Sequence, residues 1–432
     1  MRVLFTTFAA KSHLHIQIPL AWALRSAGHD VCVTSQPDLV EYISHTGLTA
    51  VGVGERLDLD VQMSGVNRRR NDSEEVAVAD DPDFLTHADL SGLRPERRTY
   101  GYLRNAFELM ATHVYPTLSS ASTVADLVGF AQRWKPDLVV WDTHTFAGAV
   151  AATVTGAAHA RLLFGADLLG HSRQLFRQEH DRLPADERSD PLAEWLGEVL
   201  DGYGGHFTED VVTGHWTMDG LPAAMRLPVP GQHHVPVRFV PYNGPSVLPD
   251  WLAEPLERPR VCLTLGSSGR EVLGADRASV TDLLEAVADV DAEVVATLSA
   301  AQLSESPKVP DNVRVVDFVP LDALLPSCSA VIHQGGAGTF QNAQLHGVPQ
   351  IIVPDLLWDS AYKMRHLRST GTGLAVADVD RFTAAQLRDM LVHVLEDPSF
   401  ARNAAGVRRE MLGMPAPRDI VPVLERLTAE YR

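Results

Sequence analysis

Apolar runs alternate with amphipathic stretches along most of this 432-residue chain. Near its start, Arg2–Thr7 predicts a short buried strand, Ile16–Ala27 has the spacing of an amphipathic helix, and Asp30–Thr34 predicts the next strand. Gly28 suits the position just after a helix end. Asp137–Trp141 predicts a later strand followed by another helix. Such alternation is typical of parallel α/β sheets.

A segment rich in proline and glycine, within residues 241–258, interrupts this pattern and predicts a linker. After it, Val261–Leu265 predicts a strand, and Ser279 suits the N-cap of a helix that ends at Val287. Further strands are predicted at Glu293–Leu298, Val313–Phe318 and Ala330–Ile332. The chain is therefore predicted to form two tandem doubly wound parallel-sheet domains that face each other across a cleft. Ligands of such sheets bind at the carboxyl ends of the strands.

The composition of the chain argues against several classes of binding partner. The formal net charge of −18 argues against nucleic acid and anionic membranes, because both are polyanions. The three cysteines lie far apart without metal-type spacing, as expected in a reducing cytoplasm. No secretory leader is recognisable, and no apolar run reaches the roughly 18 residues of a membrane-spanning helix.

The segment His333–Thr339, with the sequence HQGGAGT, lies between a predicted strand and a predicted helix. Glycines let the backbone approach an anion, and the helix N-terminus offers free N–H groups and the positive end of a dipole. The hydroxyl of Thr339 and the imidazole of His333 can donate to the same anion. The segment therefore predicts a phosphate site, although a turn needed only for packing has the same composition.

Two further loops are candidates for the same ligand. Gly266–Gly269, with the sequence GSSG, follows the first strand of the second domain, and its N–H groups with Ser267 and Ser268 can form an anion nest. A second loop carries Trp358 and Asp359, whose ring and carboxylate suit the face and hydroxyls of a sugar. An N-cap role for Asp359 is the structural alternative.

The loop after the first strand, Thr7–His15, contains no glycine, which argues against a dinucleotide-binding dehydrogenase. It carries His13 on the face where active sites form. A neutral imidazole there can deprotonate a hydroxyl, and a surface or helix-capping histidine is the alternative. Asp142, at a neighbouring strand end, is a candidate for orienting it. The three D-x-D pairs of the chain fall in predicted turns or in a charged excursion, so no metal is expected.

These residues in this order resemble the inverting GT-B glycosyltransferases of actinomycetes that attach deoxysugars to polyketide antibiotics such as macrolides and anthracyclines. The resemblance runs nearly end to end, and the segments that carry it are Lys11–Leu14, Pro19–Leu24, Trp134–Trp141, Tyr242–Pro245, Arg260–Gly266, Asn312–Arg314 and His333–Thr339. It implies two Rossmann-like domains with separate tasks. Residues 1–240 would form the domain that binds the acceptor, and residues 259–415 the domain that binds the nucleotide sugar. Residues 241–258 would link the two domains, and residues 416–432 would form a helix that packs back toward the first domain.

The resemblance also implies roles for single residues. His13 would be the general base for a hydroxyl of the aglycone, in one displacement that inverts the anomeric carbon. The donor diphosphate would be held by Ser267, Ser268, His333, Gly335, Gly336, Gly338 and Thr339. The nucleobase would meet Phe318, Val319 and Pro320, and the sugar would meet Trp358, Asp359 and Ser360. No metal or other cofactor is implied, only a dTDP-deoxysugar as co-substrate.

Three positions depart from the family pattern. Gln334 replaces a second histidine, and Ser360 replaces a glutamine that would donate toward the sugar. Gln341 stands where plant relatives use a glutamate to hold two ribose hydroxyls, which favours a 2′-deoxyribose and hence dTDP. Some relatives require a cytochrome-like auxiliary protein, and the charged excursion Leu57–Arg98 is where we expect such a contact. The oligomeric state is left open, and a homodimer is compatible with the sequence.

Other classes remain as alternatives at this point. A nucleotide-sugar 2-epimerase shares the architecture but requires carboxylates around the sugar, and analysis of products formed from the donor alone would distinguish it. A non-catalytic helper of the same fold would tolerate loss of His13. A lipid-acceptor transferase would require a basic or apolar membrane-facing patch, which the acidic balance disfavours. The aglycone, the deoxysugar and the position of attachment are not determined by the sequence.

Overall fold

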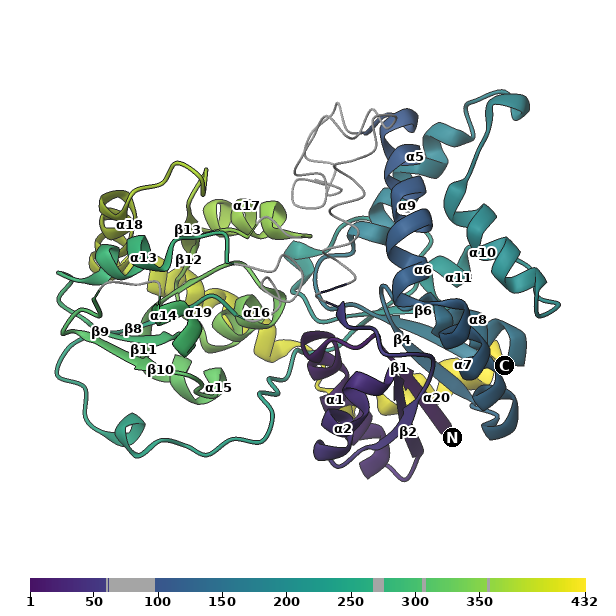
Figure 1. Cartoon of the computed structure of the whole chain (residues 1–432), viewed down its shortest axis with the longest axis horizontal. Helices are drawn as coiled ribbons and strands as arrows, with labels where there is room; N and C mark the ends of the chain where they lie inside the picture. The colour runs from purple at the N-terminus through teal and green to yellow at the C-terminus, as the bar shows by residue number, and fades with distance from the viewer. Residues whose placement is uncertain (60, 62–97, 267–275, 305–307, 356–357) are drawn as a thin grey trace. The chain divides into compact units, whose positions relative to one another are not determined.

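The computed structural model describes residues 1–59, 61, 98–266, 276–304, 308–355 and 358–432. The described chain divides into two compact units. Unit 1 contains the chain up to Val240 together with Pro415–Arg432, and unit 2 contains Pro241–Met414. Each unit is a parallel sheet with helices around it (Figure 1), which confirms the predicted α/β class.

The sheet of unit 1 has the strand order β3-β2-β1-β4-β5-β6-β7, and its paired strands are parallel. The strands are β1 (Arg2–Thr6), β2 (Asp30–Ser35), β3 (Thr49–Gly52), β4 (Leu138–Asp142), β5 (Ala158–Leu162), β6 (Trp216–Asp219) and β7 (His234–Pro236). Strand β4 is buried at every position, as expected for a central strand covered on both faces. The order runs from β1 to β2 and β3 on one side of the sheet and from β4 onward on the other, so it reverses between β1 and β4. The loops that follow β1 and β4 diverge at this reversal.

Unit 2 repeats this plan with the order β10-β9-β8-β11-β12-β13. Its strands are β8 (Arg260–Thr264), β9 (Glu293–Thr297), β10 (Val313–Val316), β11 (Cys328–His333), β12 (Gln350–Ile352) and β13 (Gly373–Ala375). The reversal lies between β8 and β11, so the loops after these two strands diverge at the carboxyl edge. Buried aliphatic side chains of both sheet faces form the core of the unit.

Helices join the strands and cover the sheets. In unit 1 they are α1 (Lys11–Ser26), α2 (Pro37–His45), α5 (Tyr100–Leu109), α6 (Tyr115–Leu118), α7 (Ala121–Trp134), α8 (Phe146–Thr155), α9 (Leu168–His180), α10 (Pro191–Asp201), α11 (Asp210–Thr213) and α20 (Pro417–Tyr431). In unit 2 they are α13 (Val280–Val287), α14 (Ala300–Ser304), α15 (Leu321–Leu324), α16 (Ala337–His346), α17 (Ser360–Thr370), α18 (Ala384–Glu396) and α19 (Pro398–Gly413). None of the described helices is long and apolar enough to cross a membrane.

Two local predictions are confirmed. Ser279 is the N-cap of α13 and accepts a hydrogen bond from the N–H of Asp282. Gly28 follows the end of α1 with a φ of +91°, a conformation that favours glycine. The start of α1 was predicted too late, because the helix begins at Lys11 rather than Ile16. Its first turn is polar, so hydrophobic periodicity does not reveal it.

The last helix, α20, packs on unit 1 against α1 and β5, so the C-terminal helix does return to the first unit. Its polar contacts include Glu425 Oε1 with Nε2 of His29, at 3.0 Å, and an ion pair between Arg432 and Asp137. The ring of Tyr431 stacks on His215, with centroids 4.6 Å apart. Leu424 of this helix is fully buried.

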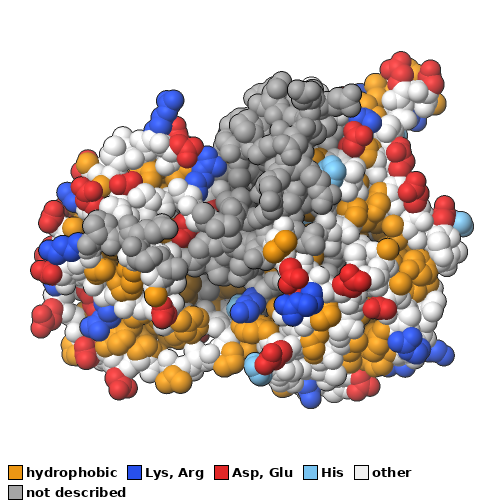
Figure 2. Space-filling view, in the orientation of Figure 1, with side chains coloured by type: hydrophobic (Ala, Val, Ile, Leu, Met, Phe, Trp, Pro, Cys, Tyr) orange, Lys and Arg blue, Asp and Glu red, His pale blue; other side chains and the backbone are white. Residues whose placement is uncertain are grey.

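Charge is distributed rather than concentrated. On the described part of the face seen in Figure 2, basic side chains do not gather into a single patch, and acidic ones are interspersed with them. Such a face offers an anion no broad positive field, so any anion bound there would have to be held by local donors.

Replacing Leu424 by alanine is expected to lower the free energy of unfolding of unit 1 by about 2–5 kcal/mol, since the truncation leaves a cavity under α20. Urea denaturation monitored by circular dichroism measures the change. Arg426 lies on the exposed side of the same helix, so Arg426→Ala is the matched control, with an expected change below about 0.5 kcal/mol. Equal effects of the two substitutions would contradict the packing described here.

Candidate functional site

His13 and Asp142 form a hydrogen-bonded pair at the strand-order reversal of unit 1. His13 lies in the first turn of α1, just after β1, and Asp142 is the last residue of β4. The Nδ1 atom of His13 lies 2.7 Å from Oδ2 of Asp142. The Asp142 side chain is only 2% exposed, and its other oxygen accepts a hydrogen bond from the N–H of His144 at 3.0 Å. The pairing that the sequence indicated for Asp142 is therefore present.

This hydrogen bond assigns the tautomer of His13. Nδ1 donates to the carboxylate, so Nε2 carries the lone pair of the neutral ring. Burial alone would raise the pKa of Asp142, but its charge interaction and hydrogen bond with His13, with smaller contributions from His144, hold that pKa below its ordinary value. Asp142 therefore stays ionised, orients the ring, and stabilises the imidazolium that forms when Nε2 takes a proton.

Aromatic rings surround His13. Its ring centroid lies 4.5 Å from that of Phe8 and 4.3 Å from that of Phe164. His144 lies 6.1 Å away, and burial lowers the pKa of His144 to about 4, so His144 is neutral near pH 7. The side chain of His13 remains 14% exposed. A partly exposed imidazole held by a buried carboxylate and bordered by apolar rings can receive a proton from a hydroxyl beside an apolar molecule.

In unit 2, the glycine loop between β11 and α16 has the geometry of an anion site. Gly335 has a φ of +100°, which only glycine adopts without strain, and Gly336 is the N-cap of α16. A Cβ atom on Gly336 would lie 2.8 Å from Nε2 of Gln334. The first N–H groups of a helix have no partner inside the helix. These groups, with the hydroxyl of Thr339 nearby, can bind a phosphate as predicted.

His333 has another role than the predicted phosphate donor. Its Nε2 lies 2.9 Å from the side-chain oxygen of Gln350, and its Nδ1 accepts a hydrogen bond from the N–H of Gly335 at 3.1 Å. Burial lowers the pKa of His333 to about 3, so the ring is neutral. Both ring nitrogens are thus occupied within the protein. In this arrangement neither ring nitrogen is left to donate to a phosphate, and the imidazole holds the N–H of Gly335 in the glycine loop.

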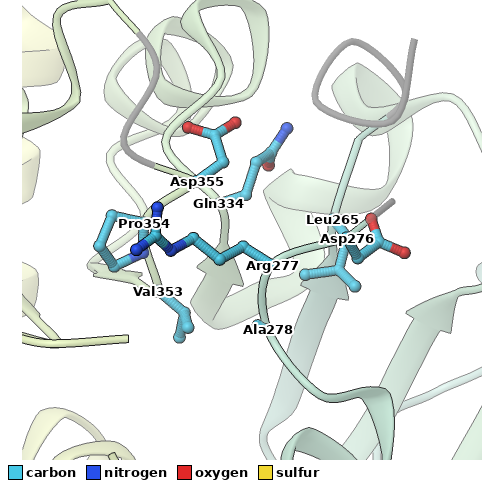
Figure 3. A pocket seen from close by; sticks show the side chains of 8 residues that line it. All are labelled: Leu265, Asp276, Arg277, Ala278, Gln334, Val353, Pro354 and Asp355. Atoms are coloured by element: carbon cyan, nitrogen blue, oxygen red, sulfur yellow. The ribbon is translucent and has the colours of Figure 1, made fainter. Parts of the chain in front are cut away.

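A pocket opens beside this loop, at the carboxyl edge of the unit 2 sheet (Figure 3). It is lined by Leu265, Asp276, Arg277, Ala278, Gln334, Val353, Pro354 and Asp355. The Gln334 side chain is only 6% exposed, and its amide oxygen has no hydrogen-bond partner among the described residues. An unsatisfied buried amide is costly. Gln334 therefore places an amide oxygen without a described partner at the pocket wall.

The predicted sugar-binding residues lie at the start of α17. Asp359 occupies the N-cap position but makes no capping hydrogen bond, and its Oδ1 lies 2.5 Å from Nζ of Lys363. The structural alternative of a capping carboxylate is therefore wrong. The hydroxyl of Ser360 donates to Oδ1 of Asp355 at 3.2 Å, and Trp358 has a φ of +47°. Sequence reasoning missed Lys363, although a lysine four residues after an aspartate on a helix is a recognised pairing.

The other predicted contacts differ in accessibility. Phe318 is exposed, whereas Val319 is buried in the core of unit 2 and Pro320 is the N-cap of α15. Of the predicted nucleobase edge, the side chain of Phe318 is therefore open to a ligand and that of Val319 is not. Ser267 and Ser268 lie outside the described residues, as does most of the excursion Leu57–Arg98.

The described residues bring together one group with the composition of a metal site, namely His159, Asp210 and His215. Nδ1 of His159 accepts from the indole N–H of Trp141, and Nδ1 of His215 accepts from the backbone N–H of His159. Both rings therefore carry their proton on Nε2, the atom that faces Asp210. A metal ligand needs a lone pair at that nitrogen, so these hydrogen bonds disfavour a metal here.

The pH dependence of stability tests the neutral state of His333. Between pH 6.5 and about 3, the unfolded chain binds a proton on this ring that the native state does not, so native stability falls as pH decreases. His333→Gln removes this contribution. The stability difference between the unaltered chain and the variant should therefore shrink by about 2 kcal/mol from pH 7 to pH 5. Urea titrations at pH 7, 6 and 5 measure it.

His45→Gln, at an exposed position of unit 1, is the control substitution for this experiment. A stability difference for His333→Gln that stays constant from pH 7 to pH 5 would contradict the neutral buried ring.

Comparisons with known proteins identify the family of this chain. The family model "Erythromycin biosynthesis protein CIII-like, N-terminal domain" matches residues 22–266, and the corresponding C-terminal domain matches residues 281–427. The aclacinomycin-T 2-deoxy-L-fucose transferase of Streptomyces galilaeus is 55% identical, covering 100% of this chain and 97% of the relative. The 10-deoxymethynolide desosaminyltransferase of Streptomyces venezuelae is 47% identical, with 100% and 98% covered.

Among solved structures, the glycosyltransferase VinC in complex with dTDP superposes with a TM-score of 0.86 at 43% identity, covering 100% of both chains. Sequence and fold thus agree along the whole length, and the alternatives of an epimerase or a helper protein receive no support. The chain belongs to the erythromycin biosynthesis protein CIII-like family and is a glycosyltransferase of the GT-B fold.

Proposed function

We propose that this glycosyltransferase moves a deoxysugar from dTDP to a hydroxyl of a polyketide aglycone, with inversion at the anomeric carbon. The observation that carries the proposal is the His13–Asp142 pair, in which a buried carboxylate fixes the imidazole with one nitrogen left to accept a proton. Relatives named as deoxysugar transferases at 55% and 47% identity support the substrate class.

On the acceptor side, Nε2 of His13 takes the proton of the hydroxyl as its oxygen attacks. Asp142 holds Nδ1–H throughout and remains ionised. Phe8 and Phe164 provide apolar surface beside the imidazole, which suits a largely hydrocarbon aglycone. General-base assistance of this kind contributes about 10²–10⁴-fold to the rate.

On the donor side, the bond between the anomeric carbon and the diphosphate oxygen breaks as the new carbon–oxygen bond forms, and dTDP leaves with the charge. The N–H groups of Gly336 and Gly338 and the hydroxyl of Thr339, at the N-terminus of α16, stabilise that charge. Gly335 shapes the loop, and Asp359 and Ser360 meet the sugar. Helix N-terminus and hydroxyl donors supply the stabilisation in this proposal without a metal.

For the nucleotide, two observations favour dTDP. The structure of VinC was solved with dTDP at 43% identity. In this chain Gln341 is buried, and its amide donates to the backbone oxygen of Ala337. Gln341 has no carboxylate to accept hydrogen bonds from the two hydroxyls of a ribose, and its amide N–H is already used within its own helix. The position therefore suits a 2′-deoxyribose. Phe318 is exposed and can cover the base.

Replacing His13 by alanine is expected to lower transfer activity by about 10²-fold or more, because the acceptor hydroxyl loses its base. Asp142→Asn should cause a similar loss by destabilising the required tautomer and the imidazolium. Product formation from a dTDP-deoxysugar and an aglycone, followed by liquid chromatography and mass spectrometry, measures both. His45→Ala, on an exposed histidine of the same unit, is the control. Full activity of His13→Ala would refute the proposed base.

Nucleotide preference is tested by thermal unfolding with dTDP, UDP and GDP. A ligand that binds only the native state stabilises it by about 2.7 kcal/mol at a concentration 100 times its Kd. We expect dTDP to raise the melting temperature most. A larger increase with UDP or GDP would overturn the choice of nucleotide.

We place the reaction in the cytoplasm, where free cysteines such as Cys32, Cys262 and Cys328 persist. A cytochrome-like auxiliary protein and a homodimer remain part of the proposal. Equal activity of the purified chain with and without a candidate partner would remove the auxiliary protein, and size-exclusion chromatography with light scattering decides the oligomeric state.

A further inference from the structure

Lys363 is a buried cation that the proposed chemistry leaves without a role. It lies on α17 with its side chain only 2% exposed. Its ammonium lies 2.5 Å from Oδ1 of Asp359 and donates to the backbone oxygen of Gly335 at 2.8 Å. It also lies 5.6 Å from the ring centroid of Phe340, a residue of α16. A buried ammonium is costly unless it is paired and hydrogen-bonded, so these contacts define its place.

These contacts join three segments around the candidate donor site. Gly335 belongs to the glycine loop, Phe340 to α16, which that loop begins, and Asp359 to the loop before α17. The glycine loop lies beside the start of α17, because a Cβ atom on Gly335 would be in ordinary van der Waals contact with the hydroxyl oxygen of Ser360, at 3.4 Å. A movement of Lys363 would therefore disturb both the phosphate loop and the sugar-binding residues.

Peptide geometry gives the hydrogen bond to Gly335 a directional consequence. The carbonyl of Gly335 and the N–H of Gly336 belong to one planar trans peptide unit and point in opposite directions. Because Lys363 holds this carbonyl, the N–H of Gly336 points away from the ammonium. Gly335 has a φ of +100°. Because glycine adopts positive and negative φ about equally readily, its backbone preference alone does not select this orientation of the peptide.

We infer that Lys363 is a positioning residue of the donor site: its ammonium fixes the Gly335–Gly336 peptide so that the Gly336 N–H is presented to the diphosphate, and it holds Asp359 for the sugar. This inference rests on the proposed function, since it assigns the diphosphate to this loop. The rival explanation is that Lys363 only neutralises Asp359 and stabilises the fold. The two differ in what happens to nucleotide affinity when both charges are removed together.

The experiment compares the unaltered chain with Lys363→Met, Asp359→Asn and the double variant that carries both. Lys363→Met alone leaves the Asp359 carboxylate buried without its cation, which can prevent folding. The double variant avoids this, and it differs from Asp359→Asn only in lacking the ammonium. Isothermal titration calorimetry measures the Kd for dTDP, and thermal unfolding without ligand measures stability separately. Lys308→Met, on an exposed lysine of unit 2, is the matched control.

We expect the double variant to bind dTDP at least about tenfold more weakly than Asp359→Asn, because a hydrogen bond from a charged group that orients the loop is lost. Asp359→Asn should keep the dTDP affinity within about threefold while lowering kcat/KM for sugar transfer, since dTDP lacks the transferred deoxysugar that Asp359 is proposed to contact. Lys308→Met should change neither quantity. Lys363→Met, where it folds, should match the double variant in dTDP affinity.

Equal dTDP affinity of the double variant and Asp359→Asn would overturn the inference, whatever their melting temperatures, and would leave Lys363 a purely stabilising role. If the unaltered chain binds UDP or GDP rather than dTDP, the proposed donor is wrong. In that case, comparing the affinities of the double variant and Asp359→Asn for the nucleotide that does bind decides the role of Lys363. Failure of the proposed donor and failure of the inference about Lys363 are therefore distinguishable.

Discussion

The structure depends on one constraint, the reversal of strand order inside each parallel sheet. Where neighbouring strands send their connections to opposite faces, the loops at their carboxyl ends diverge and backbone groups remain open to a ligand. In unit 1 this occurs between β1 and β4, and His13 and Asp142 follow or end these two strands. In unit 2 it occurs between β8 and β11, where the glycine loop begins. Each unit thus presents its chemistry at its own reversal point.

A second theme is that buried polar side chains hold the loops in place. In the low-dielectric interior, an unpaired polar group lowers the stability of the fold, whereas a hydrogen-bonded one fixes the orientation of its partners. His333 bridges Gln350 and the N–H of Gly335, and Lys363 bridges Asp359 and the oxygen of the same glycine. A residue with a φ of +100° is therefore held from both of its backbone polar groups. The mobility that glycine would otherwise have is removed before a ligand arrives.

This preorganisation bears on how a leaving diphosphate can be stabilised. Fixed N–H groups at a helix N-terminus need no reorganisation when charge develops, so their electrostatic contribution is available in the transition state. Hydrogen bonds also explain why three residues of unit 1 that resemble metal ligands have a structural role. His159, Asp210 and His215 have the composition of a metal site, yet their tautomers form a hydrogen-bonded network in unit 1, where Tyr431 of the last helix stacks on His215.

Much of the fold was predictable from the sequence because its signals are local. Hydrophobic periodicity located the strands, and Ser279 and Gly28 marked helix ends through backbone geometry that depends only on near neighbours. The same applies to the glycine loop, whose composition between a strand and a helix indicates an anion site. The start of α1 was missed because its first turn is polar.

The direction of each buried side chain was decided only by the tertiary structure. Asp142 was one candidate partner for His13, and its selection required two strands that are distant in the sequence to become neighbours. His333 had the right place for a phosphate donor, but the adjacent strand β12 brings Gln350 to its Nε2 atom, so the ring turns inward. Lys363 was overlooked because a lysine on a helix is usually solvated. Residue type and spacing determine which groups reach the edge of a sheet, whereas the partners available in the packed interior determine which of them remain open to a substrate.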